Sequence, residues 1–337
     1  MIAGFFAGAL LAGWLLTGIV RRAVVRRGLL DVPNSRSSHA NPTPRGGGIA
    51  IVLITLVAVV IGVMLQAIRT PLALAWLLGG GLVAGVGLLD DLKGLSATLR
   101  AGVHLLAALL LLNAVDAPAV LASLGLTSGW LPLFWVLGSV AAVWSINLFN
   151  FMDGIDALAS AQCLFVVLAG VLVSGMGQGI DTSLLPCVAM AGAAAGFLIW
   201  NAPPARIFMG DVGSGFIGFG LIAGALASSS RGSVSVWTWL VLNGVFAVDA
   251  SITLLTRLLR GQRIYEAHRL HVYQRLARRW SSHGRVTAVY MSINLIWCLP
   301  WAIATIKSPG HAPLVSLTAL LPLCVAAVAA GAGRSDA

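Results

Sequence analysis

Long apolar runs recur along almost the whole chain. Each is about 17 to 25 residues long, which as a helix crosses the roughly 30 Å hydrocarbon core of a bilayer. Of the 337 residues, 58% are hydrophobic and 9% charged, whereas about a quarter are charged in soluble proteins. The sequence therefore predicts an all-α, polytopic membrane protein, with one integral membrane domain over residues 1–337. We expect eleven transmembrane helices, at 2–20, 47–65, 72–89, 99–113, 130–148, 158–176, 184–200, 214–229, 236–256, 286–306 and 313–331.

The basic residues indicate the orientation, because short loops rich in Lys and Arg stay in the cytoplasm. With the N-terminus outside and the C-terminus inside, all but three of the 21 basic residues fall on the inner side. Eight of them lie in a long basic cytoplasmic loop, 257–285. The net charge of +10 is then a property of the inner face, suited to anionic lipids or phosphorylated substrates. Nucleic acid is not expected as a partner, since the chain has no basic soluble domain. The three outer residues are Arg69, Arg231 and Lys307.

Five polar clusters stand out between the apolar runs, and the topology places all of them on the inner side. Their common side predicts a single site at the cytoplasmic face. They are DVPNSRSSHANPTPRGGG (31–48), LLDDLKG (88–94), NLFNFMDGIDALA (147–159), NAPPARIFMGDVGSGF (201–216) and HRLHVYQRLARR (268–279).

Some of these residues also fit purely structural roles. Asp156 and Asp211 each precede an expected helix and could cap it, since Asp is a preferred N-cap. Asp90 and Asp91 fit such a role less well, because they sit at the negative end of a helix dipole. They require a positive partner, which could be Lys93, a metal ion or both.

Three further residues are open to two interpretations. His268 and His271 could be ordinary interfacial side chains. Asp249 lies inside an expected span, where an acid is costly. A structural pairing of Asp249 with an arginine is as compatible with the sequence as a catalytic role.

The acids nevertheless favour a functional site when they are taken together. Five of the eleven acidic residues lie near the inner interface beside the basic loop. Carboxylates with Asn oxygens suit a hard cation such as Mg²⁺, which shares its oxygen ligands with substrate phosphates. Basic side chains and glycine N–H groups suit the phosphates. The combination predicts phosphoryl transfer onto or off a lipid. The five acids are Asp90, Asp91, Asp153, Asp156 and Asp211.

The cluster at 147–159 repeats a polar residue every third position. In a regular helix such positions drift around the axis. We expect Gly154 to break the helix, which leaves Asn147 and Asn150 at the end of one span. Asp153 and Asp156 then occupy the turn and the next N-terminus, so all four face one cavity.

These motifs resemble the polyprenyl-phosphate N-acetylhexosamine-1-phosphate transferases, also called glycosyltransferase family 4. The resemblance runs through PTPRGGG, DDLKG, NLFNFMDGIDALA, NAPPARIFMGDVGS and the His-containing loop, over about residues 30 to 280 in family order. It implies that polyprenyl phosphate attacks a UDP-N-acetylhexosamine and releases UMP. It also implies a bacterial inner membrane protein, with Mg²⁺, or Mn²⁺ as a substitute, and possible homodimers.

The resemblance assigns roles to individual residues. Asp211 is the expected main Mg²⁺ ligand, with Asn150 a second. Phe208 would stack on uracil, while Asp156 and Asn201 hold the nucleoside. Catalytic roles are expected for Asp90, Asp91, Lys93 and Asp153, and further substrate contacts for Arg45, Asn147, His268 and His271.

The His-containing loop bears on the choice of substrate. The peptidoglycan-synthesising branch has three consecutive histidines, whereas this chain reads HRLHVYQ. We therefore expect the O-antigen-initiating branch, with the phospho-MurNAc-pentapeptide transferases as the alternative. A secondary transporter is the rival from another class, but transporters place ionisable groups near the bilayer midplane, and only Asp249 fits that pattern.

Overall fold

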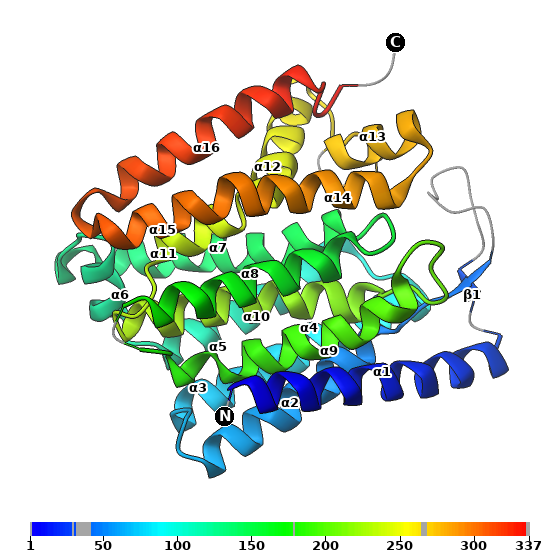
Figure 1. The fold of residues 1–337 in the computed structure, drawn as a ribbon, viewed down its shortest axis with the longest axis horizontal. Coiled ribbons are helices and arrows are strands. Elements are labelled where there is room, and N and C mark those ends of the chain that lie inside the picture. Colours follow the sequence, from blue (N-terminus) through cyan, green and yellow to red (C-terminus); the bar gives the residue numbers. More distant parts are fainter. Residues whose placement is uncertain (1, 29, 32–41, 178, 264–267, 335–337) are drawn as a thin grey trace.

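The computed structural model describes residues 2–28, 30–31, 42–177, 179–263 and 268–334. Most of these residues are helical, and most of the helices run side by side along one direction (Figure 1). The one small sheet among these described residues is the antiparallel pair β1 (Leu30–Asp31) and β2 (Thr43–Pro44). The protein is thus an all-α, multi-pass membrane protein, as the sequence predicts.

Nine continuous helical segments in the described residues are long and apolar enough to cross a membrane. Helix α2 (Gly48–Met64) is also apolar but shorter, and its 17 residues still approach the thickness of the hydrocarbon core. The nine are α1 (Ile2–Arg26), α3–η1–α4 (Thr70–Leu74, Ala75–Gly80, Gly81–Lys93), α5 (Ala97–Ala114), η2–α7 (Ser128–Trp130, Leu131–Met152), α8 (Leu158–Gly175), η3–α9 (Thr182–Leu184, Leu185–Asn201), α10 (Asp211–Ser230), α14–η4–α15 (His283–Ile293, Asn294–Cys298, Leu299–Lys307) and η5–α16 (Pro309–His311, Ala312–Ala329).

The span expected over 236–256 is not one straight helix. It is divided into α11 (Val236–Leu242) and α12 (Gly244–Leu259), which meet at an angle of 78°. At the break, the Asn243 side chain donates to the Trp239 carbonyl at 3.0 Å. A Cβ atom on Gly244 would lie 2.8 Å from Leu320, so the chain turns where its backbone packs against α16. As a result α12 runs across the direction of its neighbours (Figure 1).

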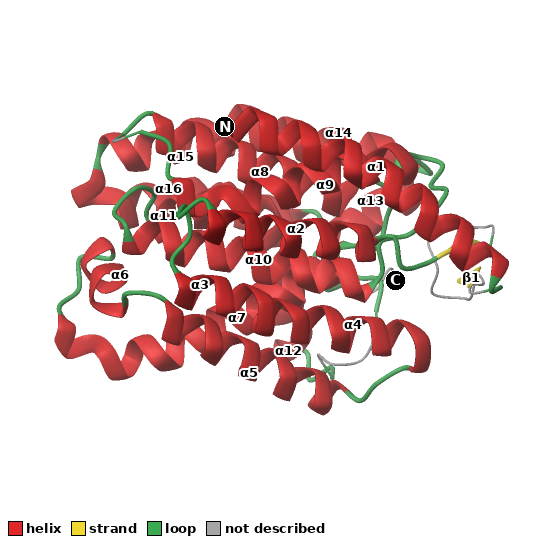
Figure 2. Cartoon of the chain, turned by 90° about the horizontal axis from the view of Figure 1, so that it is seen from below, coloured by secondary structure: helices red, strands yellow, loops and turns green. Residues whose placement is uncertain are grey.

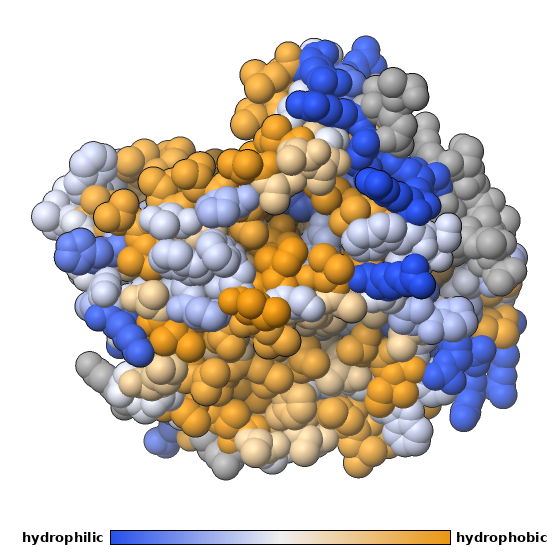
Figure 3. Space-filling view, turned by 45° about the horizontal axis from the view of Figure 1, so that its top comes forward, coloured by the Kyte–Doolittle hydropathy of each residue, from blue (hydrophilic) through white to orange (hydrophobic). Residues whose placement is uncertain are grey.

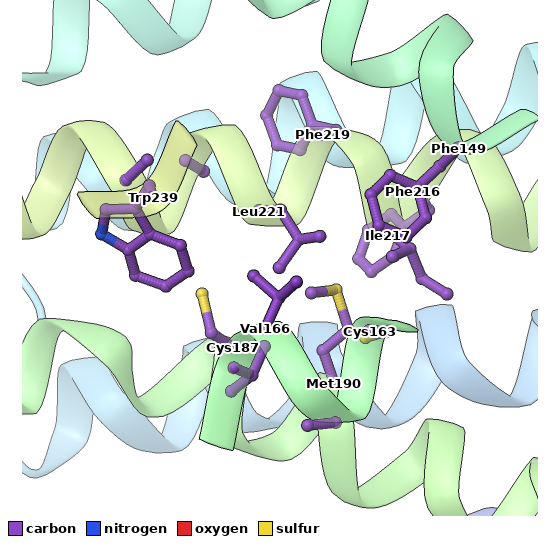
Figure 4. Packing of buried hydrophobic residues seen from close by; sticks show 14 of the residues in the cluster. Phe149, Cys163, Val166, Cys187, Met190, Phe216, Ile217, Phe219, Leu221 and Trp239 are labelled. Atoms are coloured by element: carbon purple, nitrogen blue, oxygen red, sulfur yellow. The ribbon is translucent and has the colours of Figure 1, made fainter. Parts of the chain in front are cut away.

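Helix α10 lies in the middle of the bundle (Figure 2). In the apolar stretch of α10, 94% of the residues are buried within the protein, whereas in that of α1 only 22% are buried. Its Phe216 and Phe219 rings pack edge-on against Trp76. Figure 4 shows the same helix meeting side chains from α7, α8, α9 and α11. Helix α10, which begins at Asp211, is therefore held by packing along most of its length.

The basic segment 257–285, expected as a loop, is partly helical. Helix α13 (Val272–Trp280) forms within it and buries Val272, Tyr273 and Ala277. The C-terminal residues lie against the same segment, since the Gly333 N–H donates to the Leu270 carbonyl at 3.0 Å. In Figure 3 hydrophilic residues gather at one end of the molecule and an apolar surface covers its middle. Much of the first polar cluster, residues 32–41, lies outside the described residues.

Candidate active site

Three aspartates and two arginines form one ion-pair network at the start of α10. The Arg45 guanidinium contacts Asp91 at 2.9 Å and Asp211 at 2.7 Å. One nitrogen of Arg100 contacts Asp90 at 2.7 Å and Asp211 at 3.5 Å. The Arg45 and Arg100 side chains thus connect four parts of the chain: the segment between β2 and α2, and helices α4, α5 and α10. The sequence-predicted residues Asp90, Asp91, Asp211 and Arg45 are brought together.

Asp91 caps helix α10 from another helix. Its carboxylate accepts hydrogen bonds from the N–H groups of Asp211 at 3.0 Å and Val212 at 3.1 Å. These N–H groups have no partner within their own helix, and an acid is favourable at that end of the dipole. Asp211 is consequently not the cap of its own helix. The N-cap is Gly210, whose φ of +79° and closeness to Asp91 leave no room for a side chain.

The segment after β2 pairs with the segment before α10. The N–H groups of Gly46 and Gly47 both donate to the Phe208 carbonyl, at 3.1 and 2.9 Å, and the Phe208 N–H donates to Pro44. Gly48 and Gly213 lie in backbone contact, so that a Cβ on Gly213 would be 2.6 Å from the Gly48 Cα. This close approach sets Arg45 directly beside Asp211.

The turn expected at Gly154 is present. Helix α7 ends at Met152, and α8 begins at Leu158 after Ala157, which has a φ of +68°. Asn150 lies next to the first turn of α10, because its side chain donates to the Ser214 hydroxyl at 3.3 Å. Asn147 differs: its side chain donates to the Val143 carbonyl and approaches His104 on α5. The described contacts therefore bring Asn150, but not Asn147, to Asp211.

Asp153 lies at the end of α7 among the other acids. Burial raises the pKa of Asp153 well above its ordinary value, and the charges of Asp211, Asp91 and Asp156 act in the same direction, against Arg45. A carboxylate in this position binds a proton or a cation more readily than a solvated one.

Asp156 and Asn201 hold two loops together. The Asp156 carboxylate accepts from the Ala205 N–H at 3.1 Å and contacts His283 at 3.2 Å. The Asn201 side chain accepts from the Ala157 N–H at 2.8 Å and donates to the Ile207 carbonyl at 3.0 Å. The N-cap of α8 is Ala157, so Asp156 is not used as a cap.

A cavity of about 640 Å³ opens beside Asp156. Its wall includes Pro203 and Pro204 from the loop before α10 and His283 at the start of α14. The remaining lining residues come from the basic segment, among them Arg269 and Arg278. The expected nucleoside residue Asp156 thus faces a space bordered by cations.

The two expected histidines lie together, next to α13. The rings of His268 and His271 are 4.9 Å apart, and His271 also stacks on Phe151 at 6.2 Å. Burial, with the charges of His271 and Arg257, lowers the pKa of His268 to about 3. His268 is therefore neutral at physiological pH.

Asp249 binds the start of α13, and an arginine is not its partner among the described residues. Its carboxylate accepts from the N–H groups of Val272 at 2.8 Å and Tyr273 at 3.0 Å, and from the Tyr290 hydroxyl at 2.6 Å. The Tyr273 hydroxyl in turn donates to the Phe151 carbonyl at 2.8 Å. Asp249 is thereby connected to the turn that carries Asp153.

The positive partners of Asp90 and Asp91 are Arg100 and Arg45 and not Lys93, and the sequence did not identify Arg100 as a site residue. Arg100 was counted only among the basic residues that indicate orientation. The signal for it was the need of Asp90 and Asp91 for a positive partner. Lys93 is exposed and makes no ion pair with a described acid. The Nε atom of Arg100 is buried and lacks a hydrogen-bond partner within the described part of the chain.

The donor set suits a hard divalent cation, although no three His, Cys, Asp or Glu side chains in the described residues are arranged to hold a metal. Carboxylate oxygens and the Asn150 amide are the ligands that Mg²⁺ accepts. In the structure, the two arginines contact the carboxylate oxygens of Asp211. Both arginine side chains are about one-third exposed, at 38% and 32%, so they have room to turn toward an incoming anion.

Comparisons with known proteins agree with this geometry. Residues 73–229 match the family described as glycosyl transferase family 4. A phospho-N-acetylmuramoyl-pentapeptide-transferase of Moorella thermoacetica is 31% identical over 289 residues, which cover 80% of this chain and 86% of the relative. The chain belongs to glycosyl transferase family 4.

Two further relatives are mycobacterial. The decaprenyl-phosphate N-acetylglucosaminephosphotransferase of Mycolicibacterium smegmatis is 29% identical and covers 87% of this chain and 80% of its own length. The protein with the same name from Mycobacterium leprae is 28% identical, and the match covers 78% of this chain and 74% of the relative. The family match, over residues 73–229, extends from α3 to α10. It therefore includes Asp90, Asp91, Asp153, Asp156 and Asp211.

Proposed function

We propose that this transferase moves N-acetylhexosamine 1-phosphate from a UDP-sugar to polyprenyl phosphate. An oxygen of the lipid phosphate attacks the β-phosphorus of the UDP-sugar. The bond from that phosphorus to the bridging oxygen breaks, so that the products are polyprenyl-diphospho-sugar and UMP. The observation that carries the proposal is the shared contact of Arg100 with Asp90 and Asp211, which joins DDLKG to the start of the most buried helix.

The residues act mainly by positioning and charge neutralisation, as suits a loose phosphoryl transition state. Arg45 and Arg100 turn from their carboxylates to the phosphates, and the buried Nε of Arg100 supplies a donor that has no described partner. The second pKa of a phosphate monoester is near 6, so the attacking oxygen needs no dedicated base. Asp90 therefore orients the lipid phosphate, and Asp91 keeps the start of α10 in place.

Mg²⁺ is part of the proposal, with Mn²⁺ as a substitute. Asp211 and Asn150 would hold the ion, with Asp153 close by. When bound, it supplies positive charge to the diphosphate of the nucleotide. Phe208 would stack on uracil, and Asp156 borders the cavity that we propose for the nucleotide.

N-acetylglucosamine is the first candidate for the sugar. Two of the relatives described above are named as decaprenyl-phosphate N-acetylglucosaminephosphotransferases. The product lipid would initiate O-antigen or another cell-surface polysaccharide. The Moorella relative supports the second candidate, a phospho-MurNAc-pentapeptide transfer, against which the HRLHVYQ sequence argues.

The proposal includes a location. The protein lies in a bacterial inner membrane with its N-terminus outside, its C-terminus inside and the site facing the cytoplasm, and it forms a homodimer. The distribution of Lys and Arg supports this orientation.

A defined assay tests the proposal. Purified protein in detergent is supplied with undecaprenyl phosphate, Mg²⁺ and either UDP-GlcNAc, UDP-GalNAc or UDP-MurNAc-pentapeptide. We expect UMP release with UDP-GlcNAc and a lipid product whose mass equals polyprenyl diphosphate plus one N-acetylhexosamine. EDTA should abolish the release and added Mg²⁺ should restore it. Turnover of the pentapeptide substrate alone would favour the second candidate, and absence of UMP with every sugar would overturn the proposal.

A further inference from the structure

Two arginines from different elements contact one tryptophan near the ends of α1 and α9, which lie side by side (Figure 1). The guanidinium carbon of Arg21 lies 5.9 Å from the centre of the Trp200 ring, and that of Arg206 lies 4.8 Å from it. The Nε atom of Arg21 also donates to the Arg206 carbonyl at 3.1 Å. Arg21 belongs to α1, whereas Arg206 belongs to the loop 202–210 that leads to α10. The two cations are therefore gathered at one aromatic ring.

The Trp200 ring is fixed by α1. Its Nε1 atom donates to the Trp14 carbonyl at 2.9 Å, and a Cβ atom on Gly18 would lie 3.0 Å from the ring. The indole thus fills the space that Gly18 leaves on the helix surface. The Arg206 guanidinium is fixed as well, because it donates to the Ile199 carbonyl at 2.8 Å. Both guanidinium groups are consequently positioned before a ligand binds, which reduces the entropy that binding costs.

Neither guanidinium has a carboxylate partner among the described residues. Both donate their hydrogen bonds to backbone carbonyls there. The acid that contacts the same loop, Asp156, accepts from the Ala205 N–H and lies 3.2 Å from His283. Two like charges held at one ring repel each other, and the contact with a neutral ring does not cancel their charge. The pair formed by Arg21 and Arg206 therefore keeps a net positive charge that an anion between the two groups would stabilise.

Arg21 lies at the edge of the hydrocarbon core. It is 19 positions after Ile2, where α1 begins, which at 1.5 Å per residue is about 29 Å, and the core is roughly 30 Å thick. Trp side chains favour this depth, and the phosphate groups of phospholipids lie just beyond it. Arginine binds phosphate oxygens through its planar fork of donors. The depth and the chemistry of the pair therefore both suit a lipid headgroup.

We propose that Arg21 and Arg206 together bind the phosphodiester of an anionic phospholipid with a single phosphate, as in phosphatidylglycerol, over the Trp200 ring. One guanidinium comes from α1 and the other from the loop before α10, so the bound headgroup joins these two elements. A zwitterionic headgroup is disfavoured, because its ammonium group meets two arginines. In the proposed orientation the lipid belongs to the inner leaflet, which is the anionic one. The site takes neither substrate, so it does not depend on the proposed reaction.

Lipid binding, measured by native mass spectrometry, tests the inference. Purified protein in a neutral detergent is titrated with phosphatidylglycerol. We expect Arg21→Gln and Arg206→Gln each to weaken the binding about fivefold. Arg22→Gln is the matched control, because it removes the same charge from an exposed side chain one position along α1, and it should leave the affinity unchanged. Equal weakening in all three variants would overturn the inference, since the general charge of this face would then attract the lipid.

Competition identifies the ligand. We expect that neither phosphatidylcholine nor inorganic phosphate, at the same concentration, displaces the bound phosphatidylglycerol. Displacement by inorganic phosphate would overturn the inference in favour of a site for free anions. Displacement by phosphatidylcholine would overturn it in favour of an unselective lipid surface. A fivefold rise in the KM for undecaprenyl phosphate in Arg21→Gln, without loss of phosphatidylglycerol binding, would assign the pair to the acceptor instead.

Thermal unfolding tests whether the headgroup joins the two elements. Phosphatidylglycerol should raise the Tm of the wild type and of Arg22→Gln more than phosphatidylcholine does, because it binds the folded state. It should give Arg21→Gln no such advantage. Should Arg206→Gln fail to fold, the comparison of Arg21→Gln with Arg22→Gln decides alone. An equal gain in Tm for these two variants would overturn the inference.

Discussion

The Asp91 carboxylate caps the helix that begins at Asp211, a residue 120 positions further along the chain. We expect Asp91→Ala to lose activity at least about a hundredfold and also to lower Tm, because two partly buried N–H groups lose their acceptor. Asp116→Ala is the matched control. Asp116 caps its own helix α6 (Ala117–Ser123) through the Ala119 N–H, so its loss costs about 1 kcal/mol and leaves activity intact. A fully stable Asp91→Ala protein would show that Asp91 serves chemistry alone.

Arg100 is expected to matter for catalysis more than for binding. Arg100→Ala should lower kcat about a hundredfold, since the guanidinium joins Asp90 to Asp211 and carries an unpartnered donor. Arg100→Lys keeps the charge but not the fork of donors, so it should recover only part of the rate. Steady-state kinetics with both substrates varied provide the measurement. Arg22→Ala, which removes an exposed positive charge near the end of α1, is the control for a general loss of charge. Equal effects of the Arg22 and Arg100 variants would contradict the assignment.

Asp153→Asn should raise stability and lower activity. Burial raises the pKa of Asp153, so the folded state holds a proton that the unfolded state releases above about pH 4. The wild-type protein therefore loses stability as the pH rises from there through the folded-state pKa, and the Asn variant does not. We expect the two Tm values to agree near pH 4 and the variant to become the more stable by pH 7, measured in EDTA. If the Tm difference between the Asn variant and the wild type became smaller as the pH rises, the expected direction of the effect would be refuted.

Asp249→Asn should loosen the segment that carries the histidines. An amide cannot accept all three hydrogen bonds that the carboxylate receives from Val272, Tyr273 and Tyr290. We expect faster hydrogen exchange over α13 and a higher KM for the UDP-sugar. Tyr290→Phe removes one of the three bonds and should give a smaller effect in the same direction. Unchanged exchange in α13 would mean that Asp249 does not hold this helix.

Gly213→Ala should disrupt the site by separating α2 from α10. A Cβ at position 213 would lie 2.6 Å from the Gly48 Cα, so the backbones must move apart and Arg45 with them. Gly85→Ala on α4 is the control, because nothing lies within 4 Å of its Cβ position and Ala favours a helix over Gly. We expect the first variant to lose activity and Tm, and the second to keep both. Activity in Gly213→Ala equal to wild type would contradict the close contact.

The all-α fold could be predicted from the sequence, because each apolar run must satisfy its own backbone hydrogen bonds within a bilayer. The turn at Gly154 was predictable because the three-residue spacing of polar residues around it does not fit one face of a regular helix. The break at Asn243 was not, since hydropathy continues through it and the bend arises where Gly244 meets α16. Local pattern thus predicts elements, and tertiary packing decides where they bend.

The sequence predicted the acidic residues of the candidate site better than its basic residues. Scarce carboxylates at one interface are conspicuous in an apolar chain, which identified Asp90, Asp91 and Asp211. Arg100 was not conspicuous, because basic residues are common at the inner face for reasons of orientation. The role of Asp249 depends on α13, a helix whose position no local pattern indicates. The contacts of Asn147 with Val143 and His104 are likewise set by which face of α7 meets α5.

The burial of α10 has a consequence for how the protein responds to its membrane. The helix that carries Asp211 is almost wholly enclosed by protein, whereas most residues of α1 are not buried within the protein and are available to lipid. Changes in bilayer thickness or acyl-chain order therefore act on the outer helix first and leave the chemical centre in register. Membrane composition should tune how readily acceptor reaches the protein, while the intrinsic speed of each reaction stays constant.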